Sequence, residues 1–517
     1  TNQPIRQQDK HDIQASYWKQ NYQGVSQIDW RSLYNFNYNM KNMGGDQSGM
    51  PVGRAYYIIS ERHTDQRDFN VNANLQHTFN RHSSINGGAS FRFNRTEYYQ
   101  TVKDLLGGDY FLNVDNFADR DDASGGAGND ESGRWTWNDT NETTLQQRMK
   151  GEGDKYGYDY YGFTQTAKLL ATYTFQKGPW EAQAAVEGGF TSIHREGLFK
   201  KGLFEDNSYG KSEKKRFPSY TAKVSGTYKI SPMQNITLSG ISMAKAPYFQ
   251  NVFISPRTRN TAASNIDTEK IFGGELVYSL RTPWATIRLS GFYTQFQDMT
   301  KLISAYDDVQ RAFTNFFLSD IGQRHVGGEL GFKVPIVGGL SVSGAVSYGS
   351  YVYTTNPKLT QTIDNSARVV TDGDKVYYKN LKVENTPQFA ANISLNYRTE
   401  NYWFFELDAS YFDGYYLSMN PMRRSDMVDI LLGNLNSGSI YTPEQVEQKK
   451  VDMRAQEKFH PAIVMNASIG KSWAFDRKYY LGFSLQIKNL LSYIDSPYTK
   501  NIRTGGFEQM RLYREQV

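Results

Sequence analysis

The fold of this chain is decided by the stretch Ser219-Tyr-Thr-Ala-Lys-Val-Ser-Gly-Thr-Tyr-Lys-Ile-Ser-Pro-Met-Gln-Asn-Ile-Thr-Leu-Ser-Gly-Ile-Ser-Met-Ala-Lys245. Polar residues alternate with apolar or small ones from Thr221 to Ile230, so an extended strand here has one polar face and one apolar face. A short connection, 231–234, leads into a second alternating segment. The stretch therefore predicts a β-hairpin whose two faces meet different surroundings.

Alternation of this kind recurs along the whole chain, in strands of about 9–11 residues or more, the length that a tilted strand needs to cross a bilayer. Short turns such as 335–339 alternate with long loops, as in barrels whose two rims differ. We count roughly fourteen to sixteen candidate strands. The sequence predicts an all-β fold, a transmembrane antiparallel β-barrel with long extracellular loops.

The pattern divides the chain into two regions. Residues 1–66 are polar and glycine-rich in part, so we expect a long loop region that leads into the barrel. Residues 67–517 are expected to carry the transmembrane strands, with long extracellular loops near 103–162 and 419–460.

Helical signals appear only in the second of these loops. Residues 425–433 have a helical pattern that ends in a glycine. Thr442, Pro443 and Gln445 form a helix start signal, a capping box with proline at the first helical position, ahead of residues 446–459. We expect a helical external loop here.

Composition excludes several classes of protein. No run of 18 apolar residues exists, so a helical membrane protein is excluded, whereas a barrel strand needs an apolar residue only at alternate positions. Aromatic residues make up 15% of the chain, which suits aromatic girdles at both membrane interfaces. The absence of cysteine excludes disulfides and thiolate metal sites. The net charge of +5 is dispersed, and we expect no nucleic-acid partner.

Motifs for catalysis and metal binding are sparse. Residues 125–130 match the start of a calcium-binding nonapeptide repeat, so the acidic stretch Asp119 to Asp130 is either a Ca²⁺ site or a solvated loop. Glu406 and Asp408 lie about 6.5–7 Å apart along one strand face, a spacing that suits an inverting glycosidase but is common in polar lumens. The seven histidines are scattered. We predict no catalytic residue and no cofactor.

Two groups of residues are candidates for contact with a solute. Charged residues expected on the inner face of the barrel are Lys168, Lys223, Arg288, Glu406, Asp408 and Lys488. Aromatic residues expected in extracellular loops are Trp135, Trp137, Tyr156, Tyr158, Tyr160 and Tyr161. Their rings could stack on sugars or pack on a peptide, or form the core of the loop itself.

One segment resembles a known family. Ala246-Pro-Tyr-Phe-Gln-Asn-Val-Phe-Ile-Ser-Pro-Arg-Thr-Arg-Asn260 is similar to a segment of TonB-dependent outer-membrane receptors of the Bacteroidota type. Further blocks resemble that family in the same order, among them 55–62, 206–210 and 319–330. The resemblance implies a 22-stranded barrel in the outer membrane of a Gram-negative bacterium, in contact with lipid and closed by an N-terminal plug. It also implies energy from the TonB-ExbB-ExbD system through a TonB box and, on the SusC-like branch, a SusD-like surface lipoprotein as partner.

The chain departs from the family pattern. No plug or TonB box is visible, the strand count falls short of 22, and Val517 does not end an aromatic-terminated strand. We therefore expect the C-terminal portion of such a barrel, without its last strand. The resemblance implies active import of a scarce or large solute, such as an oligosaccharide, a peptide or a metal chelate. A passive porin or surface-binding adhesin barrel is the alternative, and an outer-membrane hydrolase is the third hypothesis.

Overall fold

The computed structural model describes residues 27–42, 51–115, 135–263, 266–307, 312–363, 369–426, 442–476 and 478–493, with isolated positions between 13 and 24 and at 428. In chain order its strands are β1 (Arg54–Ala55), β2 (Ile59–Asn80), β3 (Ser83–Asp104), β4 (Tyr110–Leu112), β5 (Met149–Lys150), β6 (Lys155–Lys177), β7 (Trp180–Gly197), β8 (Gly210–Lys211), β9 (Lys215–Ser231), β10 (Gln234–Lys245), β11 (Glu269–Arg281), β12 (Thr286–Asp307), β13 (Ala312–Pro335), β14 (Leu340–Tyr353), β15 (Lys358–Ile363), β16 (Val369–Lys375), β17 (Phe389–Arg398), β18 (Trp403–Asp413), β19 (Ala462–Phe475) and β20 (Tyr479–Ile487).

Helices are few and short. They are α3 (Trp30–Asn42), α4 (Leu145–Arg148), α6 (Pro443–Arg454) and the 3₁₀ turns η1 (Gly202–Phe204), η2 (Phe249–Asn251), η3 (Pro421–Arg424) and η4 (Leu490–Tyr493). In the part of the chain that the structure describes, none of the helices has the length and apolar character needed to cross a membrane.

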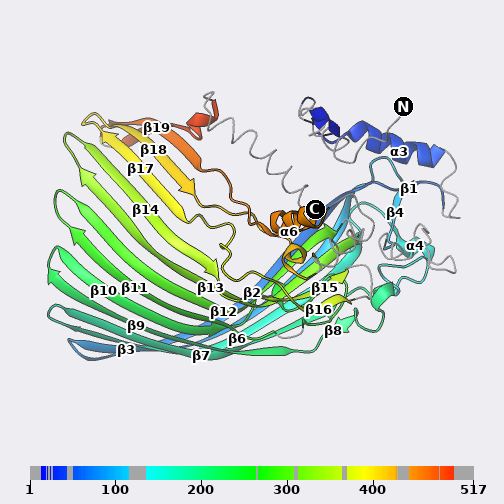
Figure 1. Cartoon of the computed structure of the whole chain (residues 1–517), viewed down its shortest axis with the longest axis horizontal. Helices are drawn as coiled ribbons and strands as arrows, with labels where there is room; N and C mark the ends of the chain where they lie inside the picture. The colour runs from blue at the N-terminus through cyan, green and yellow to red at the C-terminus, as the bar shows by residue number, and fades with distance from the viewer. Residues whose placement is uncertain are drawn as a thin grey trace.

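The long strands form one antiparallel barrel sheet in which each pairs with the next long strand along the chain. The order is β2, β3, β6, β7, β9, β10, β11, β12, β13, β14, β17, β18, β19 and β20. Figure 1 shows these strands as a curved wall running from β3 and β7 to β18 and β19. The fourteen strands within the described residues fall in the range expected from the sequence.

The two rims of the wall differ, as the sequence predicts. Short turns join β2 to β3, β6 to β7, β9 to β10, β11 to β12, β13 to β14, β17 to β18 and β19 to β20. Long connections leave the other rim, where α3, α4, β1 and β4 gather at the right of Figure 1. Gly339, in the turn between β13 and β14, packs closely on the neighbouring strand, because a Cβ there would lie 1.9 Å from the carbonyl oxygen of Arg398 in β17. A barrel with tight turns on one rim and elaborated connections on the other has the usual asymmetry of outer-membrane barrels.

The register gives the wall one apolar face along its whole width. Leu238 of β10 lies opposite Gly226 of β9 and Leu276 of β11, and all three point to the same side. Residues on this side are large, apolar and exposed: Phe69, Val71, Leu75, Leu169, Val186, Val224, Leu238, Leu276, Leu289, Ile393, Leu395, Leu407 and Leu485. An exposed apolar band of this extent is not stable in water and matches the lipid face of a membrane barrel.

The opposite face is polar. Ser225, Ser239 and Glu275 lie opposite one another on β9, β10 and β11, one residue along from the apolar positions. The expected transmembrane antiparallel β-barrel is therefore confirmed, with its polar residues facing inward and its apolar residues facing lipid.

The structure corrects the sequence-based boundaries at two places. The region 1–66 contains helix α3, and β2 begins at Ile59 rather than at residue 67. The expected loop near 103–162 is shorter, because β3 continues to Asp104 and β6 begins at Lys155. Strands of 22 or 23 residues are twice as long as a bilayer requires, so they continue beyond the membrane, where both faces are covered and the alternation fades.

The expected helix start at Thr442 is confirmed. The Thr442 hydroxyl accepts a hydrogen bond from the Gln445 amide at 3.3 Å, and the Gln445 side chain accepts one from the Thr442 amide at 2.9 Å. Helix α6 ends at Arg454 rather than continuing to residue 459. Most of the expected helix 425–433 lies outside the described residues.

Asn37 holds α3 against the long-connection rim through buried hydrogen bonds. Its fully buried amide donates to the carbonyl oxygens of Tyr57 at 2.8 Å and Leu105 at 3.0 Å, and accepts from the Tyr56 amide at 2.9 Å. We expect proteases to cleave α3 about tenfold faster in Asn37→Ala, because the buried backbone groups that Asn37 contacts lose their hydrogen-bond partners. Limited proteolysis measures this. Asn39→Ala, an exposed position on the same helix, is the control, and equal cleavage of both variants would contradict the prediction.

Candidate functional site

A groove of about 730 Å³ lies on the polar face where β2, β3, β6 and β7 approach the long-connection rim. Each of these strands contributes alternate residues, because side chains two apart point to the same face. Its uncharged polar lining comprises Thr64, Gln66, Asn70, Asn72, Ser90, Asn94, Thr96, Thr164, Thr166, Thr191, Ser219 and Gln250. These hydroxyl and amide groups can both donate and accept hydrogen bonds to a polar solute.

The cations that line this groove are already paired with acids. Arg92 contacts Asp68 at 2.8 Å, and Lys168 contacts Glu187 at 2.8 Å. The third cation, Lys245, pairs with Glu269 at 3.1 Å. The groove therefore offers hydrogen-bonding groups whose charge is locally balanced, and it is not built to attract a strong anion or cation.

Stacked aromatic rings form one wall of the groove. Tyr98 of β3 lies directly opposite Tyr160 of β6, and their ring centroids are 5.1 Å apart with nearly parallel planes. The ring of Phe249 stacks on Tyr98 at 5.9 Å. Tyr98 and Phe249 line the groove, so a flat apolar surface adjoins the hydroxyl and amide groups. Such a combination binds solutes that have both a polar rim and an apolar face.

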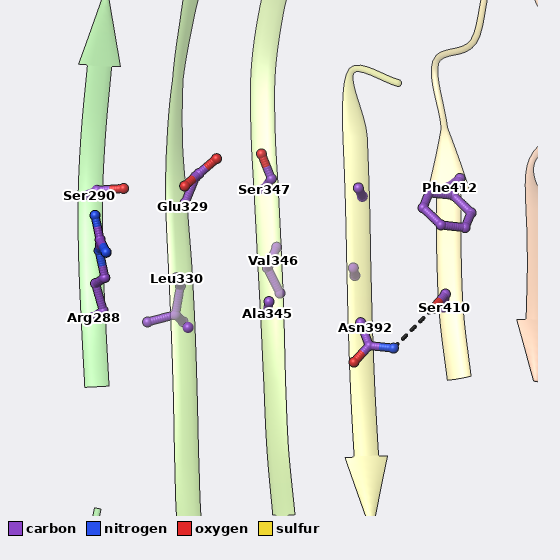
Figure 2. Close-up of a pocket in the computed structure, with 13 residues that line it drawn as sticks. Arg288, Ser290, Glu329, Leu330, Ala345, Val346, Ser347, Asn392, Ser410 and Phe412 are labelled. Atoms are coloured by element: carbon purple, nitrogen blue, oxygen red, sulfur yellow. Dashed lines mark hydrogen bonds between the residues drawn. The ribbon is translucent and has the colours of Figure 1, made fainter. Parts of the chain in front are cut away.

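Further along the polar face, two hollows of about 430 Å³ each share the carboxylate residue Glu329. Figure 2 shows one of them, with Arg288 and Ser290 on one strand and Glu329 on the next. Asn392 donates a hydrogen bond to the Ser410 hydroxyl at 2.9 Å in the same hollow. The polar groups of the inner face thus continue across the wall from β9 to β18.

The register places the predicted lumen residues as follows. Arg288 lies opposite Ser279 and Gly331, and its guanidinium contacts Glu275 at 3.4 Å. Asp408 accepts a hydrogen bond from Asn466 at 2.8 Å. The residues on the polar face are Lys168, Lys223, Arg288, Glu406 and Asp408. Lys488 follows the last residue of β20, so no strand pairing fixes its direction.

The predicted aromatic residues separate into three environments. Trp135 and Trp137 pack on Val114, and Arg148 stacks over Trp137 at 3.9 Å. Tyr156 packs edge-on against Phe111 at 5.0 Å, so these three rings belong to the core of the rim.

The other three tyrosines lie in β6. Tyr160 belongs to the stacked wall of the groove, with Tyr158 beside it at 6.0 Å. Tyr161 points to the opposite face, under Arg95 at 4.7 Å. Tyr156, Tyr158, Tyr160 and Tyr161 are strand residues, so their expected placement in a loop is corrected.

Ion pairs join β3 and β6 at the end of these strands that lies at the long-connection rim. Lys155, the first residue of β6, donates hydrogen bonds to Asp159 and Glu97. Burial alone would lower the pKa of Lys155, but these two carboxylates outweigh it and raise the pKa to about 12. Among the described residues no group of three or more His, Asp or Glu side chains could hold a metal ion. The Asp119 to Asp130 stretch lies outside the described residues.

Comparison with known proteins finds similarity in fold. No protein-family model matches the chain, and no curated protein does. The copper transporter OprC matches over 85% of this chain and 53% of its own, at 10% identity and a TM-score of 0.52. The siderophore receptor PiuA from Acinetobacter baumannii matches over 83% of this chain and 52% of its own, at 14% identity and a TM-score of 0.50.

The chain shares the barrel fold of these two proteins. It spans about half the length of the solved structures that it matches. At these identities the similarity extends to the arrangement of the strands and not to the residues of the groove.

Sequence reasoning missed Tyr98, Phe249 and Arg195. Tyr98 is one of many aromatic residues in alternating strands, and only its register opposite Tyr160 singles it out. Phe249 lies inside the segment that carries the family resemblance, but nothing in the sequence shows that it turns into the groove. Arg195 adjoins His194 in a strand, where a buried cation gives no sequence signal of its own.

Proposed function

We propose that the whole protein is an active importer in the outer membrane of a Gram-negative bacterium, and that this chain forms part of its barrel wall. The observation that carries the proposal is the two-faced sheet, with an exposed apolar band outside and a hydrogen-bonding surface inside. The fold shared with the copper transporter OprC and the siderophore receptor PiuA supports it. Energy would come from the TonB-ExbB-ExbD system acting on the whole protein.

We propose further that the solute is uncharged or weakly charged and rich in hydroxyl or amide groups. The lining of the groove supports this, because its cations are paired and its remaining polar groups are neutral. Of the solutes that the family resemblance suggests, an oligosaccharide or a peptide fits this surface better than an anionic metal chelate.

The import proposal is tested with the full-length protein in bacterial cells. Uptake of a labelled neutral oligosaccharide mixture, a labelled oligopeptide mixture and ferric citrate is compared in cells with and without a functional TonB system. Uptake of one neutral class that requires TonB supports the proposal. Uptake that persists without TonB indicates a passive porin, and hydrolysis without uptake indicates an outer-membrane hydrolase. Surface binding without uptake indicates an adhesin.

A surface lipoprotein partner of the SusD-like kind and an origin in the Bacteroidota are part of the same proposal. Both rest on the resemblance carried by residues 246–260. Purification of the full-length protein from native membranes in mild detergent tests the partner. A lipoprotein that co-purifies in a fixed ratio supports it, and a receptor that purifies alone counts against it.

The stacked wall gives a second prediction. Tyr98→Ala should weaken binding of the transported solute about tenfold, because one ring of the stack is lost and Phe249 loses its support. Tyr209→Ala, which removes an exposed ring from the connection between β7 and β9, is the matched control. Isothermal titration of the purified full-length protein measures both. Equal affinities of the two variants would show that the solute does not touch this wall.

A further inference from the structure

The connection between β10 and β11 crosses over the polar face and carries one wall of the groove. We call residues 246–263 the crossing segment. Val252 and Phe253 are fully buried against Ile193 of β7 and Phe217 of β9. Phe249, at the near end of the crossing segment, reaches the groove and stacks on Tyr98.

Arg195 of β7 ties the far end of the crossing segment to the wall. Its Nε donates to the carbonyl oxygen of Pro256 at 2.6 Å, and its Nη1 donates to the side-chain oxygen of Asn260. The same Nη1 donates to the carbonyl oxygen of Ser208 at 2.9 Å, in the connection between β7 and β9. One guanidinium therefore joins a barrel strand to two rim connections.

Arg195 is a buried cation whose guanidinium is surrounded by neutral groups. Its side chain is 1% exposed, and among the described residues no carboxylate pairs with it. Carbonyl and amide oxygens and the ring of Tyr160, 4.9 Å from the guanidinium carbon, surround it. A buried cation is costly unless its donors are all used, and a planar guanidinium can satisfy several acceptors at fixed angles as lysine cannot.

The two ends of the crossing segment are linked through the stacked rings. The guanidinium of Arg195 covers Tyr160, Tyr160 stacks on Tyr98, and Tyr98 stacks on Phe249. Gly162 provides the space for Phe249, because a Cβ there would lie 2.8–2.9 Å from the Phe249 ring. The position of Phe249 thus depends both on the far-end anchor and on the missing side chain beneath it.

We propose that Arg195 is a positioning residue that holds the crossing segment over the polar face, so that Phe249 closes one side of the groove. Arg195 is not among the groove's lining residues and acts through the segment. Lysine at this position keeps the charge but cannot reach the Pro256, Ser208 and Asn260 acceptors together. The crossing segment then separates from the wall, and the residues beneath Phe249 become accessible.

Thr96 is a suitable reporter for this change. It lies opposite Gly162 in the ladder between β3 and β6, lines the groove and is 7% exposed. This chain contains no cysteine, so Thr96→Cys in a full-length protein without other accessible cysteines reports the site alone. The measurement is the rate of labelling by a bulky, charged maleimide in detergent micelles. We expect Arg195→Lys to speed labelling about tenfold through the loss of its hydrogen bonds.

Two further variants make the test specific. Gly162→Ala should speed labelling to a similar degree by displacing Phe249, and combining it with Arg195→Lys should add little, because both release the same ring. Arg281→Lys, at the short-turn rim, should leave the rate unchanged. Heat-modified migration in gel electrophoresis shows whether each barrel remains folded. If Arg195→Lys does not fold, Asn260→Ala replaces it, since it removes one acceptor and leaves Arg195 in place.

The proposal is overturned if the folded Arg195→Lys or Asn260→Ala protein labels at the rate of the parent. Faster labelling of Gly162→Ala together with an unchanged rate in Arg195→Lys and Asn260→Ala would show that Phe249 covers Thr96 without help from Arg195, which also overturns the proposal. Faster labelling of Gly162→Ala and of either Arg195→Lys or Asn260→Ala supports the proposal. The labelling rates do not depend on uptake, so they can be interpreted even if the import proposal fails.

Discussion

Replacing Leu238 with arginine is expected to destabilise the folded barrel by about 2–4 kcal/mol, the cost of a basic residue on the lipid face near the centre of a bilayer. Leu238 is 63% exposed and lies opposite Leu276, which is also exposed. In the folded protein the new guanidinium would therefore enter the apolar band. No acidic partner lies on that face between β9 and β11, since Glu275 points to the other side.

The adjacent residue provides a matched control. Ser239→Arg introduces the same side chain one position further on, where it enters the polar face opposite Glu275. Because it can pair with that carboxylate and remain hydrated, we expect a change within about 1 kcal/mol. Unfolding by urea in lipid vesicles, followed by tryptophan fluorescence, measures both variants of the full-length protein. Equal destabilisation of the two would show that this face does not meet lipid.

The barrel could be predicted from sequence because lipid outside and water inside impose a period of two on every strand. Val224, Tyr228, Leu395 and Phe405 occupy apolar positions of this alternation, and all four are exposed on the apolar face. Beyond the membrane this constraint ends. Asp159 and Tyr160 are neighbours in β6 and point to opposite faces, yet both are buried, so the alternation is lost and the segment resembles a loop in the sequence.

The groove could be predicted only in part. Lys168 lies on a strand whose alternation fixes its direction, so its placement on the inner face follows from the sequence. The stacked wall does not, because Tyr98 and Tyr160 are 62 residues apart in the chain and meet only through the register between β3 and β6. Phe249 reaches them through a 3₁₀ turn, and Arg195 holds that connection through hydrogen bonds to backbone oxygens. Contacts of this kind depend on tertiary geometry and have no periodic signature.

The second large effect is expected at Glu384, in the connection between β16 and β17. Its carboxylate pairs with Lys301 of β12 and accepts a hydrogen bond from the Tyr353 hydroxyl at 2.7 Å. The Glu384 side chain is 12% exposed and that of Lys301 is 40% exposed, so water partly compensates the lysine when the pair is lost. We expect Glu384→Gln to loosen this connection by about 1.5–3 kcal/mol, the range for hydrogen bonds to charged groups.

Hydrogen exchange of two amides reports this loosening. The amide of Asn380 donates to Tyr353 at 2.9 Å, and that of Val383 donates to Tyr351 at 3.0 Å. Both should exchange roughly 10- to 150-fold faster in Glu384→Gln at neutral pH. Glu400→Gln changes the net charge equally at an exposed turn and should leave both amides protected. Unchanged exchange in Glu384→Gln would show that the apolar cluster of Val376, Tyr378 and Val383 holds the connection without the ion pair.

Acid should reproduce the effect of the substitution in the parent protein. Burial alone would raise the pKa of Glu384, but the charge of Lys301 and the hydrogen bonds from Lys301 and Tyr353 hold it below the usual value of 4.5. The stabilisation from this group is therefore complete above about pH 4.5, where the unfolded chain is also ionised, and is lost as the pH falls through the lowered pKa. After correction for intrinsic exchange rates, the Asn380 and Val383 amides of the parent should lose protection in that acid range. Those of Glu384→Gln should not, because glutamine does not titrate.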